Sequence, residues 1–186
     1  MTTTTIILIV IALVVLWAIF AYNRLIALVN QAKEAWADID VQLKRRYDLI
    51  PNLIESVKGY VAHEKDTLQK VTEARTIAMG AGSIADKGQA ENMLTGALKS
   101  LFAVSESYPD LKANQNFLQL QKELGDTEDK IQASRRFYNT TVMTLNTAEQ
   151  TFPSNIIASS FDFKPMDLFE LAASDAAAAE PVKVQF

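Results

Sequence analysis

Residues 6–22 read IILIVIALVVLWAIFAY, and the first charged side chain of the chain is that of Arg24. In an α-helix this stretch spans about 25 Å, and Thr2–Thr5 and Asn23 extend it toward the hydrocarbon core of a bilayer, which is about 30 Å thick. The sequence therefore predicts a transmembrane anchor over residues 1–23. The residues expected to form it include Ile6, Ile7, Leu8, Val10, Leu13, Leu16, Trp17, Phe20 and Tyr22.

Two other interpretations of this segment compete with the anchor. A cleaved signal peptide needs a positively charged start and a small-residue cleavage site, but Met1–Thr5 carry only the terminal amine and Ala21 is a weak cleavage candidate. A buried core helix is disfavoured because the segment is apolar on every face. Lys and Arg follow the span and none precedes it, so the positive-inside rule places the N-terminus outside and the body in the cytoplasm.

Composition limits the chemistry of the body. The chain carries 18 Lys and Arg against 22 Asp and Glu, so there is no basic surplus for binding nucleic acid. The absence of cysteine excludes disulfides and zinc-thiolate sites, and the single histidine, His63, excludes a histidine-rich metal site. No Gly-rich phosphate loop and no nucleophile with a neighbouring base are evident. We therefore expect no catalytic residues, no metal and no other cofactor.

The residues after the anchor show helical periodicity. Apolar residues recur every three or four positions from Leu25 to Ile50, with no breaker between them and the span, which predicts one helix from about Thr5 to Ile50. Pro51 lacks an N–H and clashes one turn back, so Pro51 and Asn52 are expected to mark a kink or a break.

Three further apolar stripes run from Ile54 to Ala78, from about Lys87 to Ser107, and from Phe117 to Phe152. Short turns separate them, so each helix is expected to bury its stripe against its neighbours. The predicted fold is all-α, with an N-terminal transmembrane helix that continues into a long-helix antiparallel bundle of about four helices. The bundle is expected to cover residues 24–164, and the acidic, Ala-rich residues 165–186 to form a flexible tail.

Charged residues interrupt the apolar stripes. They are Asp40, Arg46, Glu64, Arg75, Glu128 and Arg135. One interpretation is that they lie at the flanks of the stripes and extend to water. The other is that they form partly buried pairs between helices, which would fix the register of the bundle more than they stabilise it.

Apolar residues also remain after the last stripe. Phe161, Phe163, Leu168 and Phe169 are candidates for contacts between subunits.

Several runs resemble the LemA family of bacterial membrane proteins. They include WADIDVQLKRRYDLIPNL at 36–53, RRFYN at 135–139 and FPSN at 152–155, and the resemblance extends from Ile6 to about Glu170. The chain departs from the family at Asp162, where the family usually has glycine. The resemblance implies a single-pass anchor in the bacterial inner membrane, a cytoplasmic helical bundle and no established enzymatic activity. Some relatives shape internal membranes, and others are linked to quality control of membrane proteins.

The leading functional hypothesis is a non-enzymatic protein that self-assembles and organises or remodels the membrane. Its expected partners are the lipid bilayer, further copies of itself as a homo-oligomer with coiled-coil-like helices, and another membrane protein. The alternative is a cytoplasmic-side adaptor or regulator of a membrane protease, quality-control or signalling complex, with a contact surface around Asp48–Asn52 and Arg135–Asn139. An enzyme is the third hypothesis, which the absence of any catalytic constellation disfavours.

Overall fold

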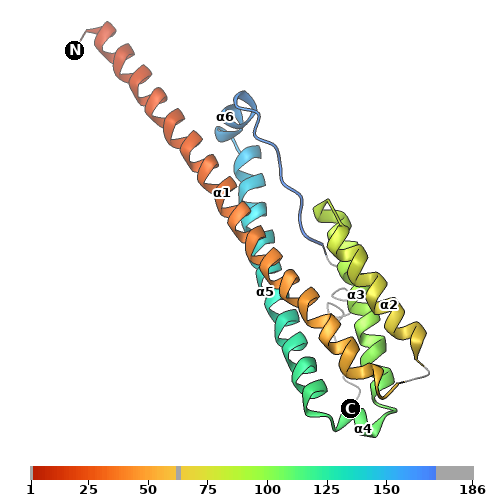
Figure 1. The fold of residues 1–186 in the computed structure, drawn as a ribbon. Helices are drawn as coiled ribbons and strands as arrows, with labels where there is room; N and C mark the ends of the chain where they lie inside the picture. The colour runs from red at the N-terminus through yellow and green to blue at the C-terminus, as the bar shows by residue number, and fades with distance from the viewer. Residues whose placement is uncertain (1, 62–63, 171–186) are drawn as a thin grey trace, which may run out of the picture. The chain divides into compact units, whose positions relative to one another are not determined.

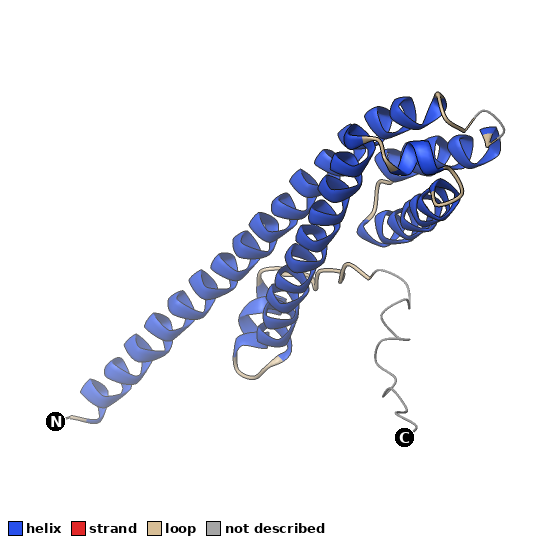
Figure 2. Ribbon diagram, turned by 90° about the horizontal axis from the view of Figure 1, so that it is seen from below, coloured by secondary structure: helices blue, strands red, loops and turns tan. Residues whose placement is uncertain are grey.

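The structure, a computed structural model, describes residues 2–61 and 64–170. These residues form helices and connecting loops, and Figure 2 shows no strand among them. The predicted all-α fold is therefore confirmed. The helices are α1 (Thr3–Lys58), α2 (Lys65–Gly80), α3 (Ile84–Ser105), α4 (Pro109–Lys112), α5 (Gln115–Gln150) and α6 (Ser154–Ser160).

The chain forms two compact units. The first comprises residues 1–39 and 134–168, and the second comprises residues 40–133 together with the chain from Phe169 on. Helices α1 and α5 each contribute to both units. The division expected from the sequence, an anchor over 1–23, a bundle over 24–164 and a tail from 165, stays a prediction.

In the first unit, α1 and the C-terminal part of α5 run antiparallel (Figure 1). The predicted stripe of α1 is buried at Leu25, Ala32, Ala35 and Ile39. The side chain of Trp36 packs against that of Tyr138, with the ring centroids 5.3 Å apart. Ala32 and Ala35 leave room on the buried face of α1 for large rings from α5. The two helices can therefore pack closely.

A short terminal segment completes the first unit. After α6 the chain turns at Asp162, whose φ of 54° lies in the left-handed region that glycine adopts without strain. This agrees with the family's preference for glycine at the position. Beyond the turn, Asn146 on α5 binds both the N–H and the carbonyl oxygen of Met166, at 3.0 and 2.9 Å. The hydroxyl of Tyr138 donates to the carbonyl oxygen of Asp167 at 2.9 Å.

The structure describes the first residues of the expected tail. Residues 165–170 follow a defined path, and the side chain of Phe169 is fully buried. Gly88 on α3 allows this, because a Cβ atom at that position would collide with the carbonyl oxygen of Glu170. The rest of the predicted tail, residues 171–186, lies outside the described residues, as does His63.

Among its described residues, the second unit contains α1 from residue 40 on, α2, α3 and α5 up to residue 133. The short helix α4 connects α3 to α5. Helices α2 and α3 form an antiparallel hairpin (Figure 1). At the start of α3, the Ser83 hydroxyl accepts a hydrogen bond from the Asp86 N–H at 3.0 Å, which satisfies a helix-terminal donor. The apolar core of this unit includes Leu43, Ile50, Leu53, Val71, Leu94, Leu101 and Ile131.

Of the two outcomes expected at Pro51, a kink or a break, the break does not occur, because α1 continues through the proline to Lys58. The second stripe does not start a new helix at Ile54, and α2 begins only at Lys65. Whether α1 bends at Pro51 and Asn52 stays a prediction. A helical residue at position 51 would donate its N–H to the carbonyl oxygen of Tyr47, four residues earlier, and proline has no N–H to donate.

The missing donor is replaced from another helix. The Nε atom of Arg75, on α2, donates to the carbonyl oxygen of Tyr47 at 2.8 Å. A charged donor makes a stronger hydrogen bond than the amide that it replaces. The guanidinium therefore compensates for the proline and ties α2 to α1.

This arrangement predicts a coupling between positions 51 and 75. Replacing Arg75 with Met should cost about 1–3 kcal/mol of unfolding free energy in the natural chain, since the Tyr47 carbonyl loses its charged donor. In a Pro51→Ala chain the same replacement should cost less, because the new N–H at position 51 serves that carbonyl. A double-mutant cycle by chemical unfolding of the full chain in mild detergent measures this difference. Equal costs in the two backgrounds would contradict the compensation.

Candidate functional site

The predicted anchor lies on the exposed N-terminal part of α1. Most of its large apolar side chains are exposed, and Leu8 and Phe20 are each 65% exposed. Within the described residues, α1 alone is long and apolar enough to cross a membrane. An exposed apolar surface this long is unfavourable in water and favourable in lipid.

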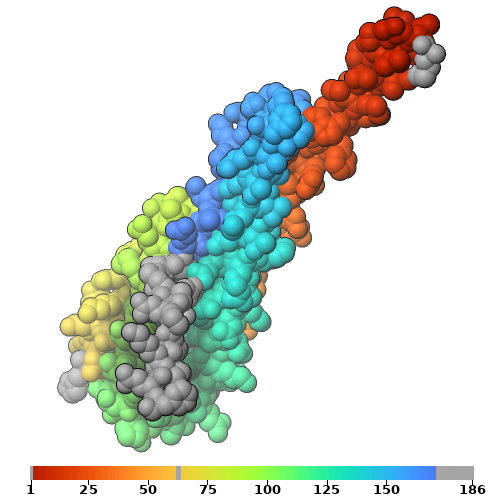
Figure 3. Space-filling model, turned by 180° about the vertical axis from the view of Figure 1, so that it is seen from behind, coloured from red at the N-terminus to blue at the C-terminus, as the bar shows by residue number. Residues whose placement is uncertain are grey.

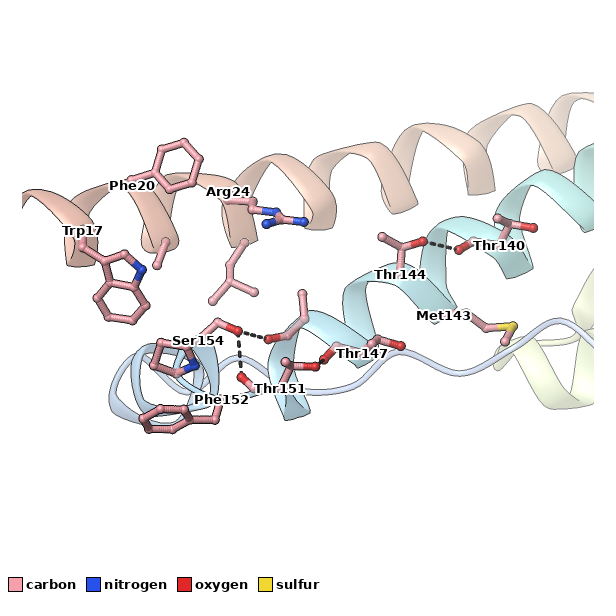
Figure 4. Close-up of a pocket in the computed structure, with 14 residues that line it drawn as sticks. Trp17, Phe20, Arg24, Thr140, Met143, Thr144, Thr147, Thr151, Phe152 and Ser154 are labelled. Atoms are coloured by element: carbon pink, nitrogen blue, oxygen red, sulfur yellow. Dashed lines mark hydrogen bonds between the residues drawn. The ribbon is translucent and has the colours of Figure 1, made fainter.

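A groove lies in the first unit where the apolar stretch of α1 ends (Figure 4). Its volume is about 680 Å³, and its walls come from α1, from α5 and from the turn between α5 and α6. Trp17, Phe20 and Arg24 line it from α1, and Met143 and Ser154 line it from the other side. Its walls are largely apolar, with hydroxyls and one guanidinium among them, and such walls suit an amphipathic ligand better than a small polar substrate.

A buried polar network lies in the second unit and centres on Arg46. The Nη1 atom of Arg46 lies 3.0 Å from Oε2 of Glu91 and 3.0 Å from Oε2 of Glu128. Its Nη2 atom donates to the Thr95 hydroxyl at 2.8 Å. Arg46 is 4% exposed and Glu91 is fully buried, so three helices meet at one desolvated cation.

Tyr47 joins the same network from the next position of α1. Its hydroxyl donates to Oε1 of Glu91 through a short hydrogen bond. Burial, together with the bond to Glu91 and the charge of Glu91, raises the pKa of Tyr47 well above its usual value, so the phenol stays protonated as a donor. Burial also raises the pKa of Glu91, while the Tyr47 hydrogen bond and the Arg46 charge oppose that rise.

This network is built for structure and not for catalysis. Glu91 is inaccessible to solvent, and both of its oxygens are engaged by Arg46 and Tyr47. A general acid or base must reach a substrate, which a carboxylate enclosed in this way cannot do. The arrangement instead favours one rotation of α1, α3 and α5 about their axes. Only in that rotation does Arg46 on α1 reach both Glu91 on α3 and Glu128 on α5.

The other charged residues of the predicted set have different partners. Asp40 lies 3.4 Å from Lys87 at the surface. Glu64 accepts a hydrogen bond from the Tyr108 hydroxyl at 3.5 Å. Arg75 binds a backbone oxygen of α1, as described above, and Arg135 is half-buried in the first unit.

Glu91 was not anticipated from the sequence, although a signal for it exists. The stripe expected from about Lys87 to Ser107 was an apolar one, and Glu91 is charged. The residues Glu91, Leu94, Leu98, Leu101 and Ser105 also recur every three or four positions, and all of them are buried. A carboxylate on such a stripe, opposite the charged stripe position Arg46, indicates a buried pair.

The four residues proposed for subunit contacts have different environments. Phe161 is 60% exposed and packs one face on Tyr22, with the ring centroids 4.8 Å apart. Phe163 is half-buried beside the same tyrosine, and Leu168 is half-buried. Phe169 is fully buried within the chain, and the role of these four residues in subunit contacts stays a prediction. Phe152, expected to face inward at the end of the fourth stripe, is also different, since it is 76% exposed.

No metal centre is found within residues 2–61 and 64–170, where no three His, Asp or Glu side chains are grouped to hold an ion.

The fold and the apolar helix together define a membrane-associated α-helical protein. The family model described as the LemA family matches residues 35–186. Protein LemA of Metamycoplasma hominis is 31% identical over 166 residues, which cover 87% of this chain and 72% of that protein. The chain belongs to the LemA family.

More distant relatives include Magnetosome protein MamQ of Magnetospirillum gryphiswaldense and Magnetosome protein MamQ 2 of Paramagnetospirillum magneticum. Each is 23% identical to this chain, over 174 and 175 residues respectively. The matched region covers 80% of this chain and 64% of each of these proteins.

One buried carboxyl group on α5 has no partner. Both side-chain oxygens of Glu149 are inaccessible to solvent and lack a hydrogen bond within the described part of the chain. Burial raises the pKa of Glu149 above its ordinary value of 4.5. The charged form of Glu149 is therefore disfavoured in the folded state, and no cation or hydrogen-bond donor opposes this effect of burial, as Arg46 and Tyr47 do for Glu91.

The pH dependence of stability follows from this shift. The folded state binds the proton of Glu149 more tightly than the unfolded state, so stability falls as pH rises from the ordinary pKa to the folded pKa. Replacing Glu149 with Gln removes this loss. The variant should exceed the natural chain in unfolding free energy at neutral pH, with the excess growing by up to about 1.4 kcal/mol per pH unit inside that window and vanishing below pH 4.5.

Unfolding in detergent across pH 4 to 8 measures this difference, and Glu34→Gln, which removes an exposed carboxylate of the same unit, is the matched control. A pH-independent difference for Glu149→Gln would contradict the buried, uncompensated charge.

Proposed function

We propose that this chain is a non-enzymatic, single-pass protein of the bacterial inner membrane that self-assembles through its helical body and organises or remodels the membrane. The observation that carries the proposal is the continuity of α1. The apolar segment passes into the part of α1 that packs on α5 without a turn or a linker between them. A helix transmits orientation, whereas a flexible linker does not, so an anchor of this kind fixes how the first unit stands on the bilayer.

Orientation follows from the positive charges. Arg24, Lys33, Lys44 and Arg45 follow the apolar segment, and no Lys or Arg precedes it. The N-terminus is then outside and the helical body is in the cytoplasm. Two relatives carry the name magnetosome protein, which agrees with a role of this family at membranes.

Self-assembly is supported by apolar side chains on the surface of the second unit. Ile77, Met79, Met93 and Leu118 are each between 46% and 55% exposed, which is typical of residues that become buried in a partner. Identical chains that share one orientation form closed symmetric assemblies, and a ring of anchors pointing one way would impose a shape on the bilayer.

The anchor itself can be tested with two substitutions of matched exposure on α1. Leu13 is 60% exposed and lies in the apolar segment, and Val41 is 63% exposed and lies beyond it. Leu13→Arg should disfavour insertion by about 2.5–3.5 kcal/mol, whereas Val41→Arg should leave insertion unchanged. The measurement is the fraction of full-length protein that resists alkaline extraction from membranes. Equal resistance of the two variants would contradict a spanning role for this segment.

Assembly is tested on the full-length protein extracted together with its lipid. Mass measurement of single particles, followed by imaging, should give one defined oligomer with its anchors aligned. Vesicles reconstituted with the protein should differ in shape from protein-free vesicles of the same lipids. A monomer that crosslinks in the native membrane to a different protein would overturn the scaffold and establish the adaptor instead. The exposed face of α1 that includes Val41, Lys44, Arg45, Asp48 and Asn52 is the surface such a partner would contact.

A further inference from the structure

The turn between α5 and α6 exposes large apolar side chains. Phe152 is 76% exposed, Ile156 is 53% exposed and Phe161 is 60% exposed. The chain carries no charge from Thr151 to Phe161. A neutral turn that offers two phenylalanines and an isoleucine to water is unfavourable unless something apolar covers it.

The position of this turn identifies what covers it. The ring of Tyr22, the last residue of the apolar stretch, lies 4.8 Å from the ring of Phe161 and 5.9 Å from that of Phe163. Trp17 and Phe20 share one groove with Phe152, Pro153 and Ser154. The turn therefore lies beside the end of the predicted span, at the depth where α1 leaves the hydrocarbon.

The pictures agree with these contacts. The N-terminal part of α1 extends beyond α6 with no other described segment of the first unit beside it (Figures 1 and 3). Trp17 projects from α1 on the side of the turn (Figure 4). Any bilayer that accommodates the apolar segment up to Tyr22 must meet the turn at its surface.

We infer that residues 152–161 form a second membrane contact, in which Phe152, Ile156 and Phe161 enter the interface of the same leaflet that surrounds Tyr22. This rests on the proposed anchor and extends it. Aromatic residues are favoured at this depth because their rings sit between headgroups and acyl chains. The hydroxyls of Ser159 and Ser160 bond to the carbonyl oxygen of Ile156, so their polar groups are satisfied without water.

The shared groove favours lipid over a second copy of the chain. Arg24 lines it close to the aromatic walls, and a guanidinium at that depth suits the phosphate of a phospholipid, while Phe20 and Met143 suit its acyl chain. With two points of contact, the end of α5 and the anchor are held at one depth, and the protein cannot rotate freely about its span.

The chain has no cysteine, so single cysteines can report the environment of each position. We would place one at Phe152, Ile156 or Phe161, and attach an environment-sensitive fluorophore to the full-length protein in phospholipid vesicles. Quenching by spin-labelled lipid is then compared with quenching by aqueous iodide. Phe20→Cys is the control within the span, and Val41→Cys, at a site 63% exposed on α1 beyond the apolar segment, is the control for an apolar surface position away from the turn.

The three turn positions should resemble Phe20, with quenching by spin-labelled lipid several-fold stronger than at Val41 and little quenching by iodide. Quenching by iodide as at Val41, with Phe20 still in lipid, would overturn this inference and leave the anchor intact. Protection from both quenchers that disappears when the protein is diluted into excess lipid would overturn it in favour of a contact between subunits. A water-exposed Phe20 would instead overturn the proposed anchor.

Discussion

The carbonyl oxygen of Tyr47 is the atom on which the course of α1 depends. Proline at position 51 cannot donate to it, and Arg75 does so from α2 at 2.8 Å. Because the helix continues, Arg46 and Tyr47 stay on the buried face of α1 and reach Glu91 on α3. Arg46 thus connects α1 to α3 through its side chain. Tyr47 connects α1 to α3 through its hydroxyl and to α2 through its carbonyl oxygen.

Glu91 and Glu149, both buried, show how burial of a carboxyl group is tolerated. Glu91 has a cation and a phenol within hydrogen-bond distance, so the cost of removing its charge from water is offset by specific partners. Glu149 has neither, and its simplest compensation is to hold a proton. The second unit therefore has a polar core that specifies one arrangement of helices, whereas the first unit relies on apolar and aromatic packing.

Much of this fold was predictable because it follows from periodicity. Leu25, Ala32, Ile39, Leu43 and Ile50 are buried as their spacing indicates, since a helix presents every third or fourth residue to the same side. The possibility of a break at Pro51 could not be decided from the sequence, because the replacement donor, Arg75, is distant in sequence. The error at Phe152 arose because an apolar residue at the end of a stripe can face lipid as well as core.

Two features of the candidate site lay beyond sequence reasoning for different physical reasons. The burial of Phe169 depends on a backbone approach at Gly88, and a single glycine in a helix carries no sign of what lies above it. The position of the α5–α6 turn along α1 depends on how far α5 extends beside α1, which helix pairing sets and amino-acid type does not. Arg46 and Arg75, by contrast, were recognisable from the sequence as candidates for contacts between helices. Their partners, Glu91 and the carbonyl oxygen of Tyr47, were not.

The two hydrogen bonds between Asn146 and Met166 involve only the main chain of Met166. The side-chain amide of Asn146 binds the N–H and the carbonyl oxygen of one residue, as a residue of a neighbouring β-strand would. Recognition of this kind does not depend on the side chain at position 166 and excludes proline alone. The residue at position 166 can therefore be replaced, which changes the surface that the segment after α6 presents, while the two hydrogen bonds to Asn146 on α5 are kept.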